Sequence, residues 1–174
     1  MVLRNPLQFP PLSPNDLLKM PILTNYQPVP LFKRLISILY DQILVIAIFI
    51  ILGLIVSTFT TFIVNDGNAI TEEHPFYLFN QIIMLLTFLL SSFGFYTWFW
   101  THGGQTLGMK TWRLMLINEG GTKISMKQAS KRYIGALLSW CFLGLGYLWS
   151  VFDDKKRCWH DFFSETYLVQ LEKK

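Results

Sequence analysis

Two long apolar runs dominate the middle of the chain. Residues 35–64 have Asp41 as their sole charged residue, and residues 76–100 contain no Asp, Glu, Lys, Arg or His. At 1.5 Å per residue, about 20 helical residues cross the roughly 30 Å hydrocarbon layer of a bilayer. Each run therefore predicts a transmembrane helix, and the residues NDGN at 65–68 supply the turn chemistry that ends the first one.

A third apolar run, residues 133–152, is also long enough to cross, but the charges favour a different path. Residues 65–75 hold three acids and no Lys or Arg, whereas four basic residues precede the first run and six lie in 103–132. The positive-inside rule therefore predicts that the N-terminus and 103–132 are cytoplasmic and that 65–75 lies outside. If the third run turns back at Gly144 and Gly146, all 15 basic residues fall on one side. We expect a re-entrant or kinked segment, and a full crossing is the alternative.

The flanking segments predict a tail and a small folded part. Residues 1–30 carry seven of the eight prolines, which predicts a tail without a helix or sheet ladder, followed by one membrane domain at 31–174. INEGGTKIS predicts a strand end and a Gly-rich turn, then a helix that starts with a capping box of Ser125 and Gln128. TYLVQL at 166–171 is predicted to pair with WRLMLI at 112–117. The expected fold is an all-α membrane protein with this short β pairing.

The composition is typical of a chain solvated mostly by lipid. Hydrophobic residues make up 52% of the chain, aromatic residues 16% and charged residues only 15%, which excludes an ordinary soluble domain. The formal net charge is +4, and in a membrane protein we expect this surplus to face anionic lipid head groups rather than nucleic acid. Cys141 and Cys158 have no neighbouring Cys at metal or redox spacing, so both are expected to be free thiols. No cofactor is predicted.

Asp41 is the one carboxylate inside an apolar run. Placing it in the membrane costs about 2.5–3.5 kcal/mol on insertion scales, so it is expected to face protein or a wet cavity. Arg34 lies two helical turns earlier on the same face, about 10 Å away along the axis. Two interpretations stay open. In the structural one, Asp41 is held by a donor such as Arg34 or Lys33, or is shallow enough to be hydrated, and fixes the helix register. In the functional one, Asp41 binds a cation or proton on a transport path.

The segment FDDKKRCWHDFFSET at 152–166 concentrates polar chemistry. Asp153, Asp154, His160 and Asp161 offer metal ligands, but His160 and Asp161 would point to opposite sides of an extended chain. A Cys158–His160 nucleophile pair lacks an evident orienting group. We favour a clamp in which the acids pair with basic residues and hold the C-terminal segment under the membrane, with Asp161 or Asp153 neutralising Arg34. The basic partners considered are Lys110, Arg113 and Arg132.

Three blocks in this order resemble the RDD family of small membrane proteins: Arg34 with Asp41, GGQTLGMKTWRLMLINEGG at 103–121, and FDDKKRCWHDFFSET at 152–166. The resemblance covers about residues 32–169. It implies that Arg34 is the family's arginine, that Asp41 is its first aspartate, and that Asp161 is its second, with Asp153 as the rival. The same blocks supply these candidate supporting residues: Gly104, Gln105, Thr106, Gly108, Lys110, Arg113, Asp154 and His160.

The resemblance implies transport of an ion or small solute, with Asp41 as the coupling group. Because two or three spans enclose little space, we expect a homo-oligomer or a place in a larger membrane complex. The alternative is a non-transporting assembly or quality-control accessory of such a complex. The expected location is the bacterial cytoplasmic membrane, and no enzymatic activity is predicted.

Overall fold

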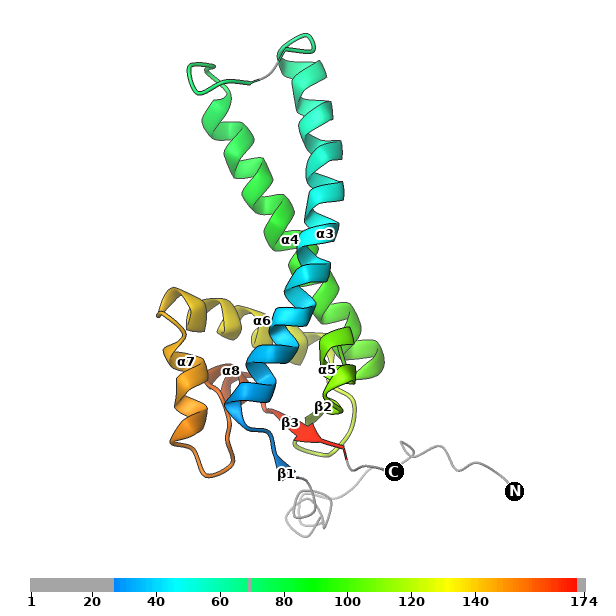
Figure 1. Ribbon diagram of the computed structural model, residues 1–174, viewed down its shortest axis with the longest axis vertical. Coiled ribbons are helices and arrows are strands. Elements are labelled where there is room, and N and C mark those ends of the chain that lie inside the picture. Colours follow the sequence, from blue (N-terminus) through cyan, green and yellow to red (C-terminus); the bar gives the residue numbers. More distant parts are fainter. Residues whose placement is uncertain (1–26, 69, 172–174) are drawn as a thin grey trace, which may run out of the picture.

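Two long helices carry a compact group of shorter elements at one end (Figure 1). The computed structural model describes residues 27–68 and 70–171. The long helices are α3 (Leu31–Val64) and α4 (Tyr77–Gly103), which cross each other. The shorter elements are β1 (Gln27–Pro28), α5 (Leu107–Thr111), β2 (Leu114–Asn118), α6 (Met126–Cys141), α7 (Leu145–Leu148), the 3-10 helix η1 (Trp149–Val151), α8 (Trp159–Ser164) and β3 (Thr166–Gln170).

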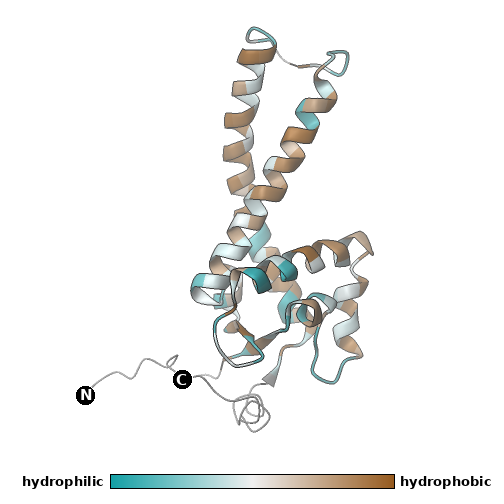
Figure 2. Ribbon diagram, turned by 180° about the vertical axis from the view of Figure 1, so that it is seen from behind, coloured by the Kyte–Doolittle hydropathy of each residue, from teal (hydrophilic) through white to brown (hydrophobic). Residues whose placement is uncertain are grey.

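Both predicted spans are confirmed as helices long and apolar enough to cross a membrane. The first span starts four residues earlier than expected because Pro30, which fits the position before a helix, serves as its N-cap. Gly104 ends the second span in the left-handed conformation that a glycine adopts without strain. Figure 2 shows hydrophobic residues along both helices, while hydrophilic residues gather mainly in the loops and the shorter elements. The chain is therefore an integral membrane protein.

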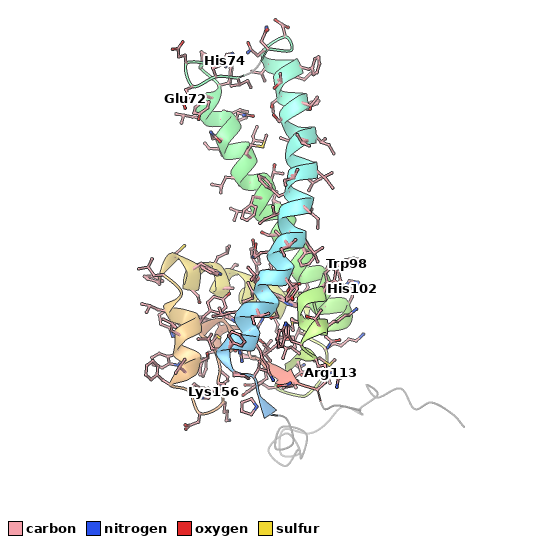
Figure 3. The ribbon with its side chains drawn as sticks, viewed as in Figure 1. Glu72, His74, Trp98, His102, Arg113 and Lys156 are labelled. Carbon is pink, nitrogen blue, oxygen red and sulfur yellow. The ribbon has the colours of Figure 1, made fainter. Side chains whose placement is uncertain are left out.

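The third apolar run is bent, as expected for a kinked segment. The helical direction changes by 109° between α6 and the α7–η1 pair. Gly144, with φ of +80°, makes the turn, and its N–H donates to the carbonyl of Ser139 (2.8 Å). The run does not carry the chain to the far end of the long helices, because Arg113 before it and Lys156 after it lie at the same end (Figure 3). Figure 3 places Glu72 and His74, which belong to the loop between the spans, at the opposite end.

The predicted strand pairing is also confirmed. β2 and β3 are antiparallel with Leu116 opposite Leu168, and β1 adds to the free edge of β3, so the strand order is β1-β3-β2. The expectation that no sheet ladder enters residues 1–30 is wrong at Gln27 and Pro28; residues 1–26 lie outside the described residues. Pro28 is tolerated because β1 is an edge strand, where a missing N–H leaves no central ladder position unpaired.

A small core joins the sheet to the long helices where α3 begins and α4 ends. Leu114 and Leu116 of β2 are fully buried and pack in one cluster with Trp100 of α4 and Leu168 of β3. The predicted capping box starts α6: the Ser125 hydroxyl accepts from the Gln128 N–H (3.3 Å), and the Gln128 side chain accepts from the Ser125 N–H (3.0 Å). Tyr133 of α6 belongs to the same cluster, and its hydroxyl lies 2.5 Å from the Ser92 hydroxyl of α4, so α6 packs against α4 near the polar residues described next.

Candidate functional site

One buried carboxylate, Asp161, joins three helices. It lies at the third position of α8, where its Oδ2 accepts from the Cys158 N–H (2.8 Å). The same oxygen accepts from Nη1 of Arg34 on α3 (2.7 Å), and Oδ1 accepts from Nη1 of Arg132 on α6. The predicted contacts of the clamp are thus present, with Asp161 as the acid that neutralises Arg34 and Arg132 as its second partner.

Each guanidinium has further partners that fix its position. Arg34 donates to the carbonyls of Val29 (3.3 Å) and Lys156 (2.7 Å), and Arg132 donates to the Thr166 hydroxyl (2.8 Å). Arg132 also lies over the Trp100 ring, 5.4 Å from the centroid, where a cation is attracted to the ring face. Two guanidiniums share one carboxylate, so the cluster carries a net positive charge in a buried place.

Burial and these charges set the protonation states of three residues at the start of α8, namely Asp161, His160 and Cys158. Burial alone would raise the pKa of Asp161, but Arg34 and Arg132 outweigh it and hold this pKa well below the usual range of a carboxyl group. Burial lowers the pKa of His160 to about 3, so the ring is neutral at pH 7. Burial raises the pKa of Cys158 to about 11, which keeps the thiol protonated and a poor nucleophile.

The four residues considered as metal ligands do not converge. Asp153 accepts from the backbone and side chain of Arg157 (2.9 and 3.3 Å), and Asp154 is exposed. His160 and Asp161 lie close together because the segment is helical rather than extended, and with Cys158 their candidate ligand atoms lie within 4.8 Å of one another. Both oxygens of Asp161 already accept from guanidiniums, so a cation bound there would lie beside two positive charges. This arrangement disfavours a metal.

Asp41 has a separate set of partners. The Thr106 hydroxyl donates to its Oδ2 (2.5 Å) and the Gly108 N–H donates to its Oδ1 (2.8 Å), while only 1% of the residue is exposed. Neither of the donors named in the structural interpretation binds Asp41, but Thr106 and Gly108 hold it in their place, so a structural role stands beside the functional one. Arg34 binds Asp161, and Lys33 donates to Gln170 (2.7 Å).

The GGQTLGMK segment is shaped to reach Asp41. A Cβ on Gly108 would lie 2.1 Å from the Ser37 carbonyl, so only glycine allows α5 to approach α3 this closely. Gly104 turns the chain out of α4, and Gln105 donates to the Leu114 carbonyl (2.7 Å). Thr106 caps α5 and bonds Asp41 at once. Two candidate supporting residues, Lys110 and Arg113, are exposed and take no part in this contact.

A cavity of about 450 Å³ lies between α3, α4 and α6. Its wall includes both Asp41 and residues of the cluster around Asp161. Arg34 and Asp41 line it, as do Arg132 and His160. Sequence reasoning placed Arg132 only as an ion-pair partner and missed the polar groups that complete the wall. These are Ser37, Gln42, Ser92, Tyr96, Tyr133 and Tyr147. The sequence indicates these residues in one way: hydroxyl and amide side chains recur within otherwise apolar runs.

The comparisons with known proteins agree with this geometry. The model of the RDD family matches residues 28–165, a range that holds both aspartates and both arginines of the cavity region. A relative, "Uncharacterized protein YxaI" of Bacillus subtilis (strain 168), is 29% identical over 150 residues, covering 82% of this chain and 97% of that protein. No solved structure matches. With most of its length matched by the family model, the chain belongs to the RDD family.

Proposed function

We propose that this protein transports a small solute or ion across the bacterial cytoplasmic membrane and binds it in the cavity between α3, α4 and α6. The observation that carries the proposal is a cavity of about 450 Å³, of the size that holds small ligands, lined by buried charged side chains at one end of two spans. Charged groups within or beside membrane spans are costly, so they mark ligand or ion paths by default.

Asp41 is suited to couple protonation to movement of the cavity wall. When ionised it accepts from Thr106 and from Gly108, which hold α5 against α3. A proton on Oδ1 would face the Gly108 N–H and break that bond, whereas a proton on Oδ2 would reverse the bond with the Thr106 hydroxyl, which accepts as well as donates. Met109 of α5 lines the cavity next to this contact. Protonation of Asp41 would therefore break or reverse a bond that holds one wall of the binding site.

Transport by this chain requires more than one copy. Few residues in either span are buried, because two crossing helices enclose little space. We propose a homo-oligomer in which neighbouring copies complete the path. The basic residues at the end near Arg113 and Lys156 face the cytoplasm under the positive-inside rule, and the acidic loop at 65–75 faces outside.

Flux through vesicles that contain only this protein tests the proposal. Proton movement is read with an enclosed pH-sensitive dye under imposed gradients of sodium and of small anions. We expect flux from the unaltered protein, strong reduction by Asp41→Asn, and no change from Glu73→Gln, which alters an exposed acid in the outer loop. Absence of proton movement with correctly folded protein rejects proton-coupled transport of sodium and small anions, and full flux from Asp41→Asn rejects the coupling role alone.

A second function, that of a non-transporting accessory in a larger membrane complex, has one observation in its favour. Many large apolar side chains of α3 and α4 are exposed and available to pack against other membrane helices. Isolation in mild detergent separates the two cases: copies of this chain alone support the transporter, and a fixed ratio to a larger protein supports the accessory. We propose no enzymatic role, since the thiol of Cys158 is protonated and its neighbour His160 is held neutral.

A further inference from the structure

We propose that the ligand of this cavity is an amphiphile with one anionic head group and an apolar chain. This inference rests on the proposed use of the cavity as a ligand site and names the chemical class that fits it. Three features carry it: the positive charge at the end of the cavity formed by Arg34 and Arg132, a buried Arg132 N–H without a partner, and the direction in which the cavity runs.

The end of the cavity formed by Arg34 and Arg132 carries an excess of positive charge. Arg34 and Arg132 are 3% and 5% exposed and share the single carboxylate of Asp161, while His160 beside them is neutral. Asp41 lines the same cavity, but its oxygens face the neutral donors of Thr106 and Gly108, and both guanidiniums are paired with Asp161. An anion at this end would pair directly with a guanidinium N–H in a buried place, where an incompletely paired charge is costly.

Two donor-bearing groups at this end are unsatisfied. Among the described residues, Nε of Arg132 and Nδ1 of His160 are buried side-chain nitrogens with no hydrogen-bond partner, and both residues line the cavity. A buried polar group left without a partner is costly, so such groups are uncommon in folded proteins. The Arg132 N–H can only donate, whereas neutral His160 carries its single N–H on Nδ1 or on Nε2, and its Nε2 lies 3.6 Å from Oδ1 of Asp161. An oxygen atom of a carboxylate or phosphate would satisfy the Arg132 N–H.

The cavity continues from this charged end along the spans. Trp100 lies against Arg132, and Phe88, which also lines the cavity, lies 12 residues earlier in α4 and so about 18 Å away along the helix axis. Leu137 and Trp140 of α6 complete an apolar wall. A ligand with its head at Arg132 and its chain toward Phe88 would have the orientation of a lipid, with the charge at the boundary and the hydrocarbon inward.

Such a ligand has two sources, a membrane phospholipid or a free fatty acid. We would measure binding to the purified full-length chain in a non-ionic detergent by native mass spectrometry. The probes are palmitoyl lysophosphatidylglycerol, palmitate, and palmitoyl lysophosphatidylcholine, which has the same chain and no net charge. We expect at least one anionic probe to bind about tenfold tighter than the choline lipid, the effect of one charge-assisted hydrogen bond. The tighter of the two anions identifies the source.

Two α6 variants locate the site without altering the charged cluster. Ala136 lines the cavity, so Ala136→Phe should fill it and weaken binding of the preferred anion about tenfold or more. Ile134→Phe places the same side chain on α6 at a position that is 56% exposed, and should leave binding unchanged. Arg132→Gln should remove the preference for the anion over the choline lipid. Equal binding of charged and uncharged probes, or undiminished binding by Ala136→Phe, would overturn the inference.

The outcome is separable from that of the flux experiment. Preferential binding of the anionic probe, lost in Ala136→Phe, supports this inference even if vesicles show no flux, and only transport is then rejected. Flux that depends on Asp41 without preferential binding of the anions rejects the ligand class and leaves transport in place.

Discussion

At the scale of single residues, the site depends on a close approach that only one glycine permits. Asp41 bonds α5 because Gly108 has no side chain to meet Ser37. Gly108→Ala is expected to push α5 away from α3 and to lower the free energy of unfolding by about 1–3 kcal/mol, the usual cost of overpacking. Thermal unfolding in detergent measures the loss.

Gly103→Ala is the matched control for that variant. A Cβ at Gly103, the last residue of α4, meets nothing within 4 Å, and alanine favours the helical state. Its unfolding midpoint should equal or slightly exceed that of the unaltered protein. If the two glycine variants behave alike, the contact between α5 and Asp41 does not stabilise the fold.

His160 gives a pH dependence whose sign follows from its burial. The pKa is about 3 in the folded protein and near 6.5 when unfolded, so between these values the unfolded chain binds more protons. Stability from this residue is therefore complete above about pH 6.5 and is lost as the pH falls toward 3. Over pH 5–7 the unfolding midpoint should fall with acidification, and His160→Phe should flatten this slope.

His102→Phe makes the same change at an exposed histidine and is expected to keep the slope of the unaltered protein. Restricting the measurement to pH 5–7 separates His160 from Asp161, because the unfolded carboxyl group titrates near pH 4. A slope that persists in His160→Phe would show that His160 is not held neutral by burial.

At the scale of elements, β3 is the strand on which the sheet depends, since it pairs with both β1 and β2. Leu168→Ala is expected to lower the free energy of unfolding by about 2–5 kcal/mol, because it removes a core side chain that packs with Leu116. Gln170→Ala removes only the partly buried bond from Lys33 and should cost less than about 1.5 kcal/mol. Equal losses for the two variants would contradict this assignment of the core.

The elements themselves were largely predictable from the sequence. Lipid requires long apolar helices, so α3 and α4 follow from composition, and the bend at Gly144 follows from the positions of glycine and charge. The contacts of Asp41 were not predictable, because Thr106 is 65 residues away and hydrophobic periodicity constrains only neighbours along a helix. A carboxylate partner for Arg34 is predictable because each charge near a membrane requires a partner, but the choice of Asp161 over Asp153 is not.

At the scale of the whole molecule, the bent third run predicts that all basic residues share one side of the membrane. Cysteines placed at Glu73 and Lys155, in a chain with Cys141→Ser, report the two ends. A membrane-impermeant thiol reagent applied to intact cells is expected to label position 73 and to leave position 155 unlabelled until the cells are opened. Buried Cys158 should stay unlabelled in both cases. Labelling at 155 in intact cells would contradict the same-side arrangement.

The Asp161 cluster ties the first span to α6 and α8, and this tie is the central claim. Asp161→Ala leaves two buried guanidiniums without an anion and is expected to cost about 3–5 kcal/mol of unfolding free energy, whereas Arg34→Ala leaves Arg132 still paired and should cost less. Asp153→Ala, which breaks a partly exposed pair with Arg157, is the control and should cost less than about 1 kcal/mol.

The most direct test is a double-mutant cycle of Arg34→Ala and Asp161→Ala, read by unfolding of the purified protein in detergent. The cluster predicts that Arg34→Ala destabilises the Asp161→Ala protein far less than it destabilises the unaltered one, because the positive charge it removes is then unpaired. Fully additive losses would show that the two side chains act independently and that α3 is not held by Asp161.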